Sequence, residues 1–252
     1  EVEPALATSW QISEDGLRYT FDLRKGVRFH DGTPFNAEAV KFNFERMLDP
    51  QHPYHDTGPF PLAFFFSAVQ SVEALGEHQV IFTLDAPYAP FLANLAYPTG
   101  LLASPTAIQK YAKDVGRHPV GTGAFRFVEW QSNAKVVLVR NADYWDGAAA
   151  LEAVVFRPIT DANTRIAEML SGGLDLMVEV PPDNVLTFAR DDDFEIHQQG
   201  GPHVWFLILN TREGIFRDKR VRQAVNYAID KQTLVDNVLQ GTATVSAGPI
   251  PP

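Results

Sequence analysis

The chain has 252 residues, of which 45% are hydrophobic and 21% charged, and its formal net charge is −10 at neutral pH. This composition is typical of a soluble globular protein with one large domain or two modest ones, and it argues against extensive disorder. The negative charge disfavours nucleic acids and anionic lipid surfaces as partners, and the absence of cysteine excludes disulfides, thiolate metal sites and cysteine nucleophiles.

The first part of the chain has the period of a half-buried strand, followed by a helix. Tyr19, Phe21 and Leu23 alternate with polar residues, which predicts a strand. Asn36 is a favourable N-cap for a helix that ends near residues 49–50 and has Val40, Phe44 and Met47 on one face. Residues 51–66 hold several Pro and Gly residues and three consecutive Phe residues, which indicates an irregular segment.

The sequence next predicts an antiparallel hairpin of strands 69–75 and 79–84, then short helices at 89–95 and 106–113. After Pro119 strands and helices interleave. The predicted strands are 124–129, 135–140, 153–157 and 174–180, and the predicted helices are 161–170 and 231–239. The nearly continuous apolar run 203–210 predicts a central buried strand. We therefore place a domain boundary near His118, between an antiparallel-rich module (1–118) and an α/β module (119–252).

Motifs of catalysis and metal binding are weak in this sequence. Gly121-Thr122-Gly123 lacks the remaining residues of a dinucleotide or Walker loop and favours a backbone turn. His52 and His55 flank a Pro-containing loop with too few ligands for a metal, and Asp191-Asp192-Asp193 lacks the spacing of a calcium loop. No Ser lies in a Gly-x-Ser-x-Gly elbow. We expect no catalytic residues, no metal site and no cofactor.

Two membrane-related features are absent from the sequence. No apolar run approaches the ~20 residues that span a bilayer, and the acidic residues Glu1 and Glu3 do not fit the basic start of a secretion signal. Any targeting segment is expected to lie outside these residues.

Four blocks resemble the family 5 extracellular solute-binding proteins, which include dipeptide, oligopeptide, nickel and glutathione binders. The blocks are residues 6–32, 119–125 (PVGTGAF), 141–145 (NADYW) and 216–230 (FRDKRVRQAVNYAID). They keep the order of the family and cover nearly the whole chain. Residues 104–123 and 157–165 resemble the glutathione and dipeptide binders most. Members of the family are about twice this long, so the resemblance implies a fragment without the N-terminal strands and the second lobe.

The resemblance implies an α/β fold, with part of a periplasmic-binding-protein-like type II lobe (119–252) and a smaller α+β accessory module (1–118). The intact protein is expected to be a monomer that captures a peptide-like solute and delivers it to the permease subunits of an ABC transporter. The expected location is periplasmic or extracellular, with a lipidated N-terminal anchor outside this chain as one option. Enzyme activity is not expected.

Four residues are expected to contact the solute. Glu179 and Val180 match a segment through which relatives touch the peptide backbone, and Trp205 falls where an aromatic residue lines the cleft. Tyr97 is added from the accessory module. The alternative is that Trp205 takes a buried core position, as is common for tryptophan, and that Glu179 is only a solvated surface residue. Two other functions stay open: binding of nickel or another metal chelate within the same family, and peptide hydrolysis, for which the sequence shows no nucleophile or metal set.

Overall fold

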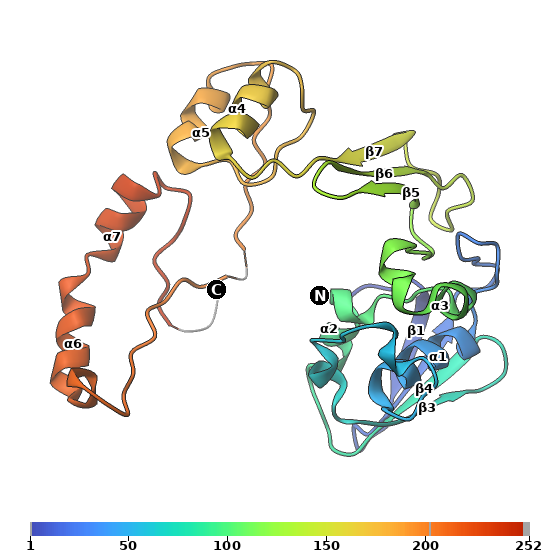
Figure 1. Cartoon of the computed structure of the whole chain (residues 1–252). Helices are drawn as coiled ribbons and strands as arrows, with labels where there is room; N and C mark the ends of the chain where they lie inside the picture. Colours follow the sequence, from blue (N-terminus) through green and yellow to red (C-terminus); the bar gives the residue numbers. More distant parts are fainter. Residues whose placement is uncertain (1, 202, 249–252) are drawn as a thin grey trace. The chain divides into compact units, whose positions relative to one another are not determined.

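The computed structural model describes residues 2–201 and 203–248, and the chain divides into two compact units, Glu1–Pro158 and Ile159–Pro252. Figure 1 shows both units, coloured along the chain from blue at the N-terminus to red at the C-terminus. The first unit holds two separate antiparallel sheets together with the helices and helical turns that connect their strands. The elements of the first unit are β1 (Ala7–Ile12), β2 (Arg18–Leu23), α1 (Ala37–Leu48), η1 (His55–Thr57), η2 (Ala63–Phe66), β3 (Val69–Ala74), β4 (Gln79–Leu84), α2 (Phe91–Leu95), η3 (Pro98–Gly100), α3 (Pro105–Tyr111), η4 (Ala112–Arg117), β5 (Phe125–Gln131), β6 (Lys135–Arg140) and β7 (Ala153–Phe156).

The main core lies on one face of the four-stranded sheet, whose strand order is β1-β2-β4-β3. The alternation predicted for β2 is confirmed, because Tyr19, Phe21 and Leu23 are all buried. Helix α1 begins after Asn36, whose side chain accepts a hydrogen bond from the backbone N–H of Ala39 (2.9 Å). The predicted hairpin is also confirmed as β3 and β4, which pair antiparallel.

Aromatic rings fill the space between the sheet and α1. The centroid of the Phe82 ring on β4 lies 4.8 Å from that of Phe44 on α1 and 5.7 Å from that of Phe21 on β2. Both pairs of rings are nearly edge to face. Phe66 and Phe91 complete the cluster from η2 and α2. Such pairs are stabilised beyond their buried area by ~0.5–1.5 kcal/mol each, so this cluster anchors the irregular segment 51–66 to the regular elements.

The second sheet has the order β5-β6-β7 and no fully buried side chain in its strands. It is tied to the main core by Trp145, which packs against the core while the guanidinium of Arg24 lies 4.4 Å from its ring centroid. Trp10 also packs against the core, whereas Trp130 is exposed. The boundary predicted near His118 lies between the two sheets. The two compact units divide instead after Pro158, and the His118 boundary stays a prediction about the intact protein.

The second unit is helical in its regular parts. Its elements are α4 (Ala162–Leu170), α5 (Pro182–Ala189), η5 (Ile215–Arg217), α6 (Lys219–Ala228), α7 (Lys231–Thr233) and the π-helical turn η6 (Leu234–Val238). The helix expected at 161–170 is confirmed with Asp161 as its N-cap, and the helix expected at 231–239 is present as α7 and η6. Helices α5 and α6 were not predicted.

The strands predicted at 174–180 and 203–210 are wrong for this structure, because neither segment is a strand. A strand exists only where a neighbour accepts and donates its backbone hydrogen bonds, and no strand is assigned in the part of the second unit that the structure describes. The apolar run is consequently exposed rather than central and buried, which corrects the expectation drawn from its composition.

Candidate functional site

Glu179 and Val180 lie in the loop that precedes α5. Glu179 is exposed, and its backbone has φ = +64°, the left-handed region that residues other than glycine adopt rarely. Four other residues of the described chain that are not glycine share this feature, so it marks a constrained loop rather than a site by itself. Pro181 and Pro182 follow and begin α5, which fixes the end of this loop.

Trp205 is almost completely exposed to solvent, with a relative accessibility of 97%. Within the described residues of the second unit, Trp205 is therefore not part of a core. Its neighbours Phe206, Leu207 and Ile208 are exposed as well. Within the described residues no ring contact is assigned to Trp205, and no hydrogen bond or ring contact joins it to Glu179 or Val180.

Tyr97 belongs to the first unit, where it precedes η3 and is 51% exposed. Its ring lies edge to face against Phe65, with centroids 5.6 Å apart. The four predicted residues are thus all accessible, at least in part. Tyr97 is in a different unit from the other three, so a joint site made by all four is a prediction.

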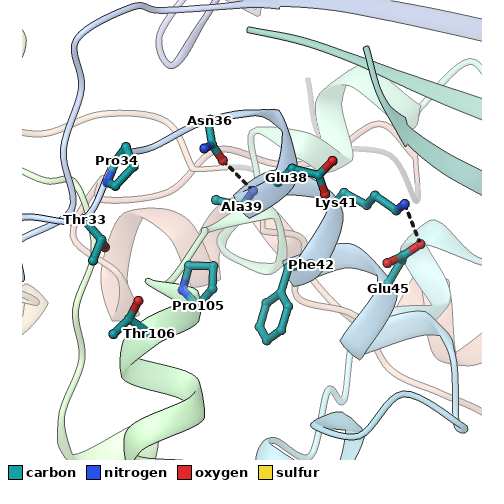
Figure 2. A pocket seen from close by; sticks show the side chains of 10 residues that line it. All are labelled: Thr33, Pro34, Asn36, Glu38, Ala39, Lys41, Phe42, Glu45, Pro105 and Thr106. Atoms are coloured by element: carbon teal, nitrogen blue, oxygen red, sulfur yellow. Dashed lines mark hydrogen bonds and ion pairs between the residues drawn. The ribbon is translucent and has the colours of Figure 1, made fainter. Parts of the chain in front are cut away.

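The structure shows a cavity of about 410 Å³ that the sequence did not indicate (Figure 2). It lies between the exposed face of α1 and the first turn of α3. Its lining residues are Thr33, Pro34, Asn36, Glu38, Ala39, Lys41, Phe42, Glu45, Pro105 and Thr106. Lys41 and Glu45 form an ion pair one turn apart, with Nζ and Oε1 separated by 3.8 Å. The spacing of Glu38, Lys41, Phe42 and Glu45 places them on one helix face, but only the fold brings Pro105 and Thr106 opposite.

A second cavity, of about 640 Å³, lies at one end of the four-stranded sheet and is lined by Thr8, Asp22, Leu23, Arg24, Lys25, Leu75, His78 and Gln79. The carboxylate of Asp22 is occupied within the protein, since it accepts hydrogen bonds from Gln79 Nε2 (2.9 Å) and Ser9 Oγ (3.0 Å). These two bonds hold the pKa of Asp22 below its usual value, the bond from Gln79 contributing most. The Asp22 side chain is therefore held in place at this end of the sheet by hydrogen bonds within the protein.

The segment 121–123 forms a turn, as the sequence favoured, and its carbonyl groups are used inside the protein. The carbonyl of Gly121 accepts from the backbone N–H of His30 (2.8 Å), and that of Gly123 accepts from His30 Nε2 (2.9 Å) and Asn141 Nδ2 (3.1 Å). Burial lowers the pKa of His30. These bonds join the loop before α1 to the chain that enters β5.

A polar network centred on the buried Ser104 lies beside this turn. Ser104 is completely buried, and its hydroxyl donates to Asp31 Oδ2 (2.5 Å) and also accepts from the backbone N–H of Ala107 at the start of α3. Thr33 donates to the other carboxylate oxygen of Asp31 from its backbone N–H (3.0 Å) and its hydroxyl (2.5 Å). Partial burial alone would raise the pKa of Asp31, but the hydrogen bonds from Ser104 and Thr33 outweigh it and leave the pKa below its usual value.

The two histidines considered as metal ligands have other partners. His55 Nδ1 bonds to the carbonyl of Arg46 (2.9 Å), and His52 Nδ1 accepts from the backbone N–H of Tyr54 (3.2 Å). Over residues 2–201 and 203–248 no group of three or more His, Asp or Glu side chains is placed to hold a metal ion. In the same ranges no helix is long and apolar enough to cross a membrane.

Comparison with known proteins places these features in a family context. The chain matches the family described as bacterial extracellular solute-binding proteins, family 5 Middle, over residues 1–252. It is 37% identical to heme-binding protein A of Haemophilus influenzae, with 100% of this chain and 49% of that protein covered. It is 35% identical to the glutathione-binding protein GsiB of Pectobacterium atrosepticum, with 98% and 47% covered.

Among solved structures, the periplasmic binding protein DppA from Helicobacter pylori, in complex with the peptide STSA, is similar with a TM-score of 0.88 and 36% identity. The similarity covers 100% of this chain and 52% of that one. The chain thus spans about half the length of the relatives that it matches.

Proposed function

Because the chain belongs to the bacterial extracellular solute-binding proteins of family 5, we propose that the whole protein is the substrate-binding component of an ABC importer. It captures a peptide-like solute, such as a dipeptide, an oligopeptide or glutathione, and delivers it to permease subunits in the membrane. The observation that carries this proposal is the family match over residues 1–252, together with relatives named for glutathione and in complex with a peptide. A binding role also explains why no catalytic motif was found, so enzyme activity is not part of the proposal.

The proposed mechanism is closure of two lobes around the solute. Ligand sites of this kind lie in the crevice between lobes, where a few polar groups fix orientation and apolar groups exclude water. We assign Glu179 to accept hydrogen bonds from N–H groups of the solute, Val180 and Trp205 to cover apolar parts, and Tyr97 to add a contact from the accessory module (1–118). The exposure of Glu179, Trp205 and Tyr97 leaves their side chains available for such contacts.

The proposed location is periplasmic or extracellular, in keeping with the family. We propose that the intact protein is a monomer, and that a lipidated N-terminus is one way in which it is held at the membrane.

The test is direct binding to the full-length protein. Mass spectrometry of the ligand that co-purifies with it, followed by calorimetry with dipeptides, oligopeptides and glutathione, is expected to give one peptide-like solute with micromolar or tighter affinity, about −8 kcal/mol or better. Absence of binding to every peptide-like compound would refute the proposal. Cleavage of a bound peptide would favour the hydrolase alternative.

Binding of a metal chelate is the second candidate, because a relative with 37% identity is named for heme and one structurally similar protein, NikZ from Campylobacter jejuni, was solved in complex with Ni(L-His). The same calorimetry with hemin and with nickel–histidine separates the two, as does elemental analysis of the purified protein. A stoichiometric transition metal would favour the chelate, and its absence together with peptide binding would favour the peptide.

A further inference from the structure

A basic and aromatic cluster lies on the first unit, apart from the residues assigned to the solute. Residues 110–118 contain four basic side chains, counting His118, and one acidic side chain, Asp114. They occupy the end of α3, the turn η4 and the residue after it. This concentration of positive charge stands out because the whole chain has a net charge of −10.

Three of these side chains are held in place by aromatic rings rather than by carboxylates. The guanidinium of Arg117 lies 4.5 Å from the ring centroid of Trp130 on β5 and donates to Ser132 Oγ (3.3 Å). The His118 ring is stacked on Tyr111, with centroids 4.2 Å apart and an interplanar angle of 16°. Lys110 Nζ lies 4.8 Å from the centroid of Tyr111.

Lys113, on the same turn, differs from Lys110, Arg117 and His118 because it is paired with a carboxylate. Lys113 Nζ forms an ion pair with Asp56 (2.9 Å), so much of its charge is neutralised within the protein. Among the described residues no carboxylate forms an ion pair with Lys110, Arg117 or His118. An aromatic face orients a cation without cancelling its charge, and the positive charge of Lys110 and Arg117 stays available to an external anion.

We propose that Lys110, Tyr111, Arg117, His118 and Trp130 form a docking surface for an acidic polypeptide segment. The Arg117 guanidinium lies against Trp130 and keeps N–H groups that suit a carboxylate. Lys110, which lies against the Tyr111 ring on which His118 stacks, provides a second positive charge. Carboxylate side chains spaced along one peptide match a few fixed cations of this kind. None of these five residues is among those assigned to the solute, and the inference does not depend on the proposed function.

An anionic membrane is the other source of negative charge, and the observations favour it less. Membrane attachment through basic residues gains about 1 kcal/mol for each Lys or Arg near the surface, so it requires a larger group than this cluster. The net charge of −10 also repels an anionic bilayer from the molecule as a whole, whereas a short acidic segment meets only the local charge.

The test follows the indole N–H signal of Trp130 by NMR during titration with a short polyglutamate peptide at low ionic strength. A Trp130→Phe variant assigns the signal. We expect Trp130 and residues 110–118 to shift with polyglutamate but not with polyglutamine of the same length. Arg117→Gln should weaken binding by ~3–5-fold and Lys110→Gln by ~2-fold, the range for exposed charges, with both effects lost at high salt.

Arg18→Gln is the matched control, because Arg18 is an exposed arginine of the same unit outside the cluster, and it should leave the affinity unchanged. Equal weakening by Arg18→Gln and Arg117→Gln would reduce the effect to overall charge and overturn the proposal. Sedimentation with phosphatidylglycerol vesicles is the second arm. Binding to these vesicles without any shift by polyglutamate would also overturn it, in favour of the membrane.

Discussion

Ser104 shows how one buried hydroxyl can connect distant parts of a chain. It caps α3 through the N–H of Ala107 and donates to Asp31, which lies in the loop before α1. We expect Ser104→Ala to destabilise the protein by about 1–3 kcal/mol, because it removes a helix cap and the hydrogen bond from a completely buried hydroxyl to Asp31. Urea unfolding at neutral pH, monitored for the first unit, measures this change.

The same network predicts a pH dependence. The folded state holds the pKa of Asp31 below the ordinary value of about 3.9, so ionised Asp31 stabilises the folded state above that pH, and this contribution is lost as the pH falls through the folded pKa. The free energy of unfolding of Asp31→Asn should therefore be lower than that of the wild type at neutral pH and approach it in acid. Asp114→Asn, at an exposed position, serves as the control and should differ little at either pH. A constant gap for Asp31→Asn between neutral and acidic pH would contradict the role assigned to the carboxylate.

Trp205 and Glu179 provide the residue-scale test of the solute site. In the full-length protein, Trp205→Ala and Glu179→Ala should each weaken solute binding by at least ~1 kcal/mol, the scale of a lost contact in a binding cleft. Calorimetry with the physiological solute measures the change, and circular dichroism checks that the fold is intact. Trp130→Ala removes another exposed tryptophan outside the predicted site and should leave solute affinity unchanged. Wild-type affinity in both site variants would mean that the cleft is lined by other residues.

At the level of elements, β4 holds the first unit together, because it pairs with both β2 and β3 and carries Phe82 into the aromatic cluster. We expect Phe82→Ala to lower the free energy of unfolding by about 3–5 kcal/mol, the range for removing a buried aromatic side chain. Phe64 is the matched control, since it is 61% exposed, and Phe64→Ala should cost less than ~1 kcal/mol. Thermal unfolding of the two variants measures both losses of stability. Equal losses for Phe82→Ala and Phe64→Ala would contradict the assignment of Phe82 to the core.

The elements of the first unit were predictable because their signals are local. Alternation in β2, the Asn36 cap of α1 and the hairpin of β3 and β4 need no knowledge of the rest of the chain. Helices α5 and α6 also begin at local signals, with Pro182 at the first position of α5 and Asp218 as the N-cap of α6.

The unpredictable features depend on contacts between distant residues. Residues 203–210 have the composition of a buried strand, but composition does not provide the neighbouring strand that pairs with it. The cavity beside α1 likewise needs Pro105 and Thr106, which follow α1 by about sixty residues. The proposed solute residues came from family resemblance, since neither periodicity nor charge distinguishes Glu179 or Tyr97 from other exposed side chains.

At the scale of the whole molecule, the second unit has an apolar surface that its own described residues do not cover. Trp205, Phe206, Leu207 and Ile208 are consecutive and all strongly exposed, and the segment has high β propensity and no charge between residues 204 and 209. We therefore expect the 252-residue chain on its own to self-associate as its concentration rises, since pairing of such segments buries apolar area and satisfies backbone hydrogen bonds.

Light scattering over a concentration series measures the effect. Ile208→Lys should suppress association by placing a charge in the segment, whereas Lys231→Gln, which changes an exposed residue outside it, should not. A chain that stays monomeric at high concentration, or associates equally in the Ile208→Lys variant, would show that this segment does not govern association.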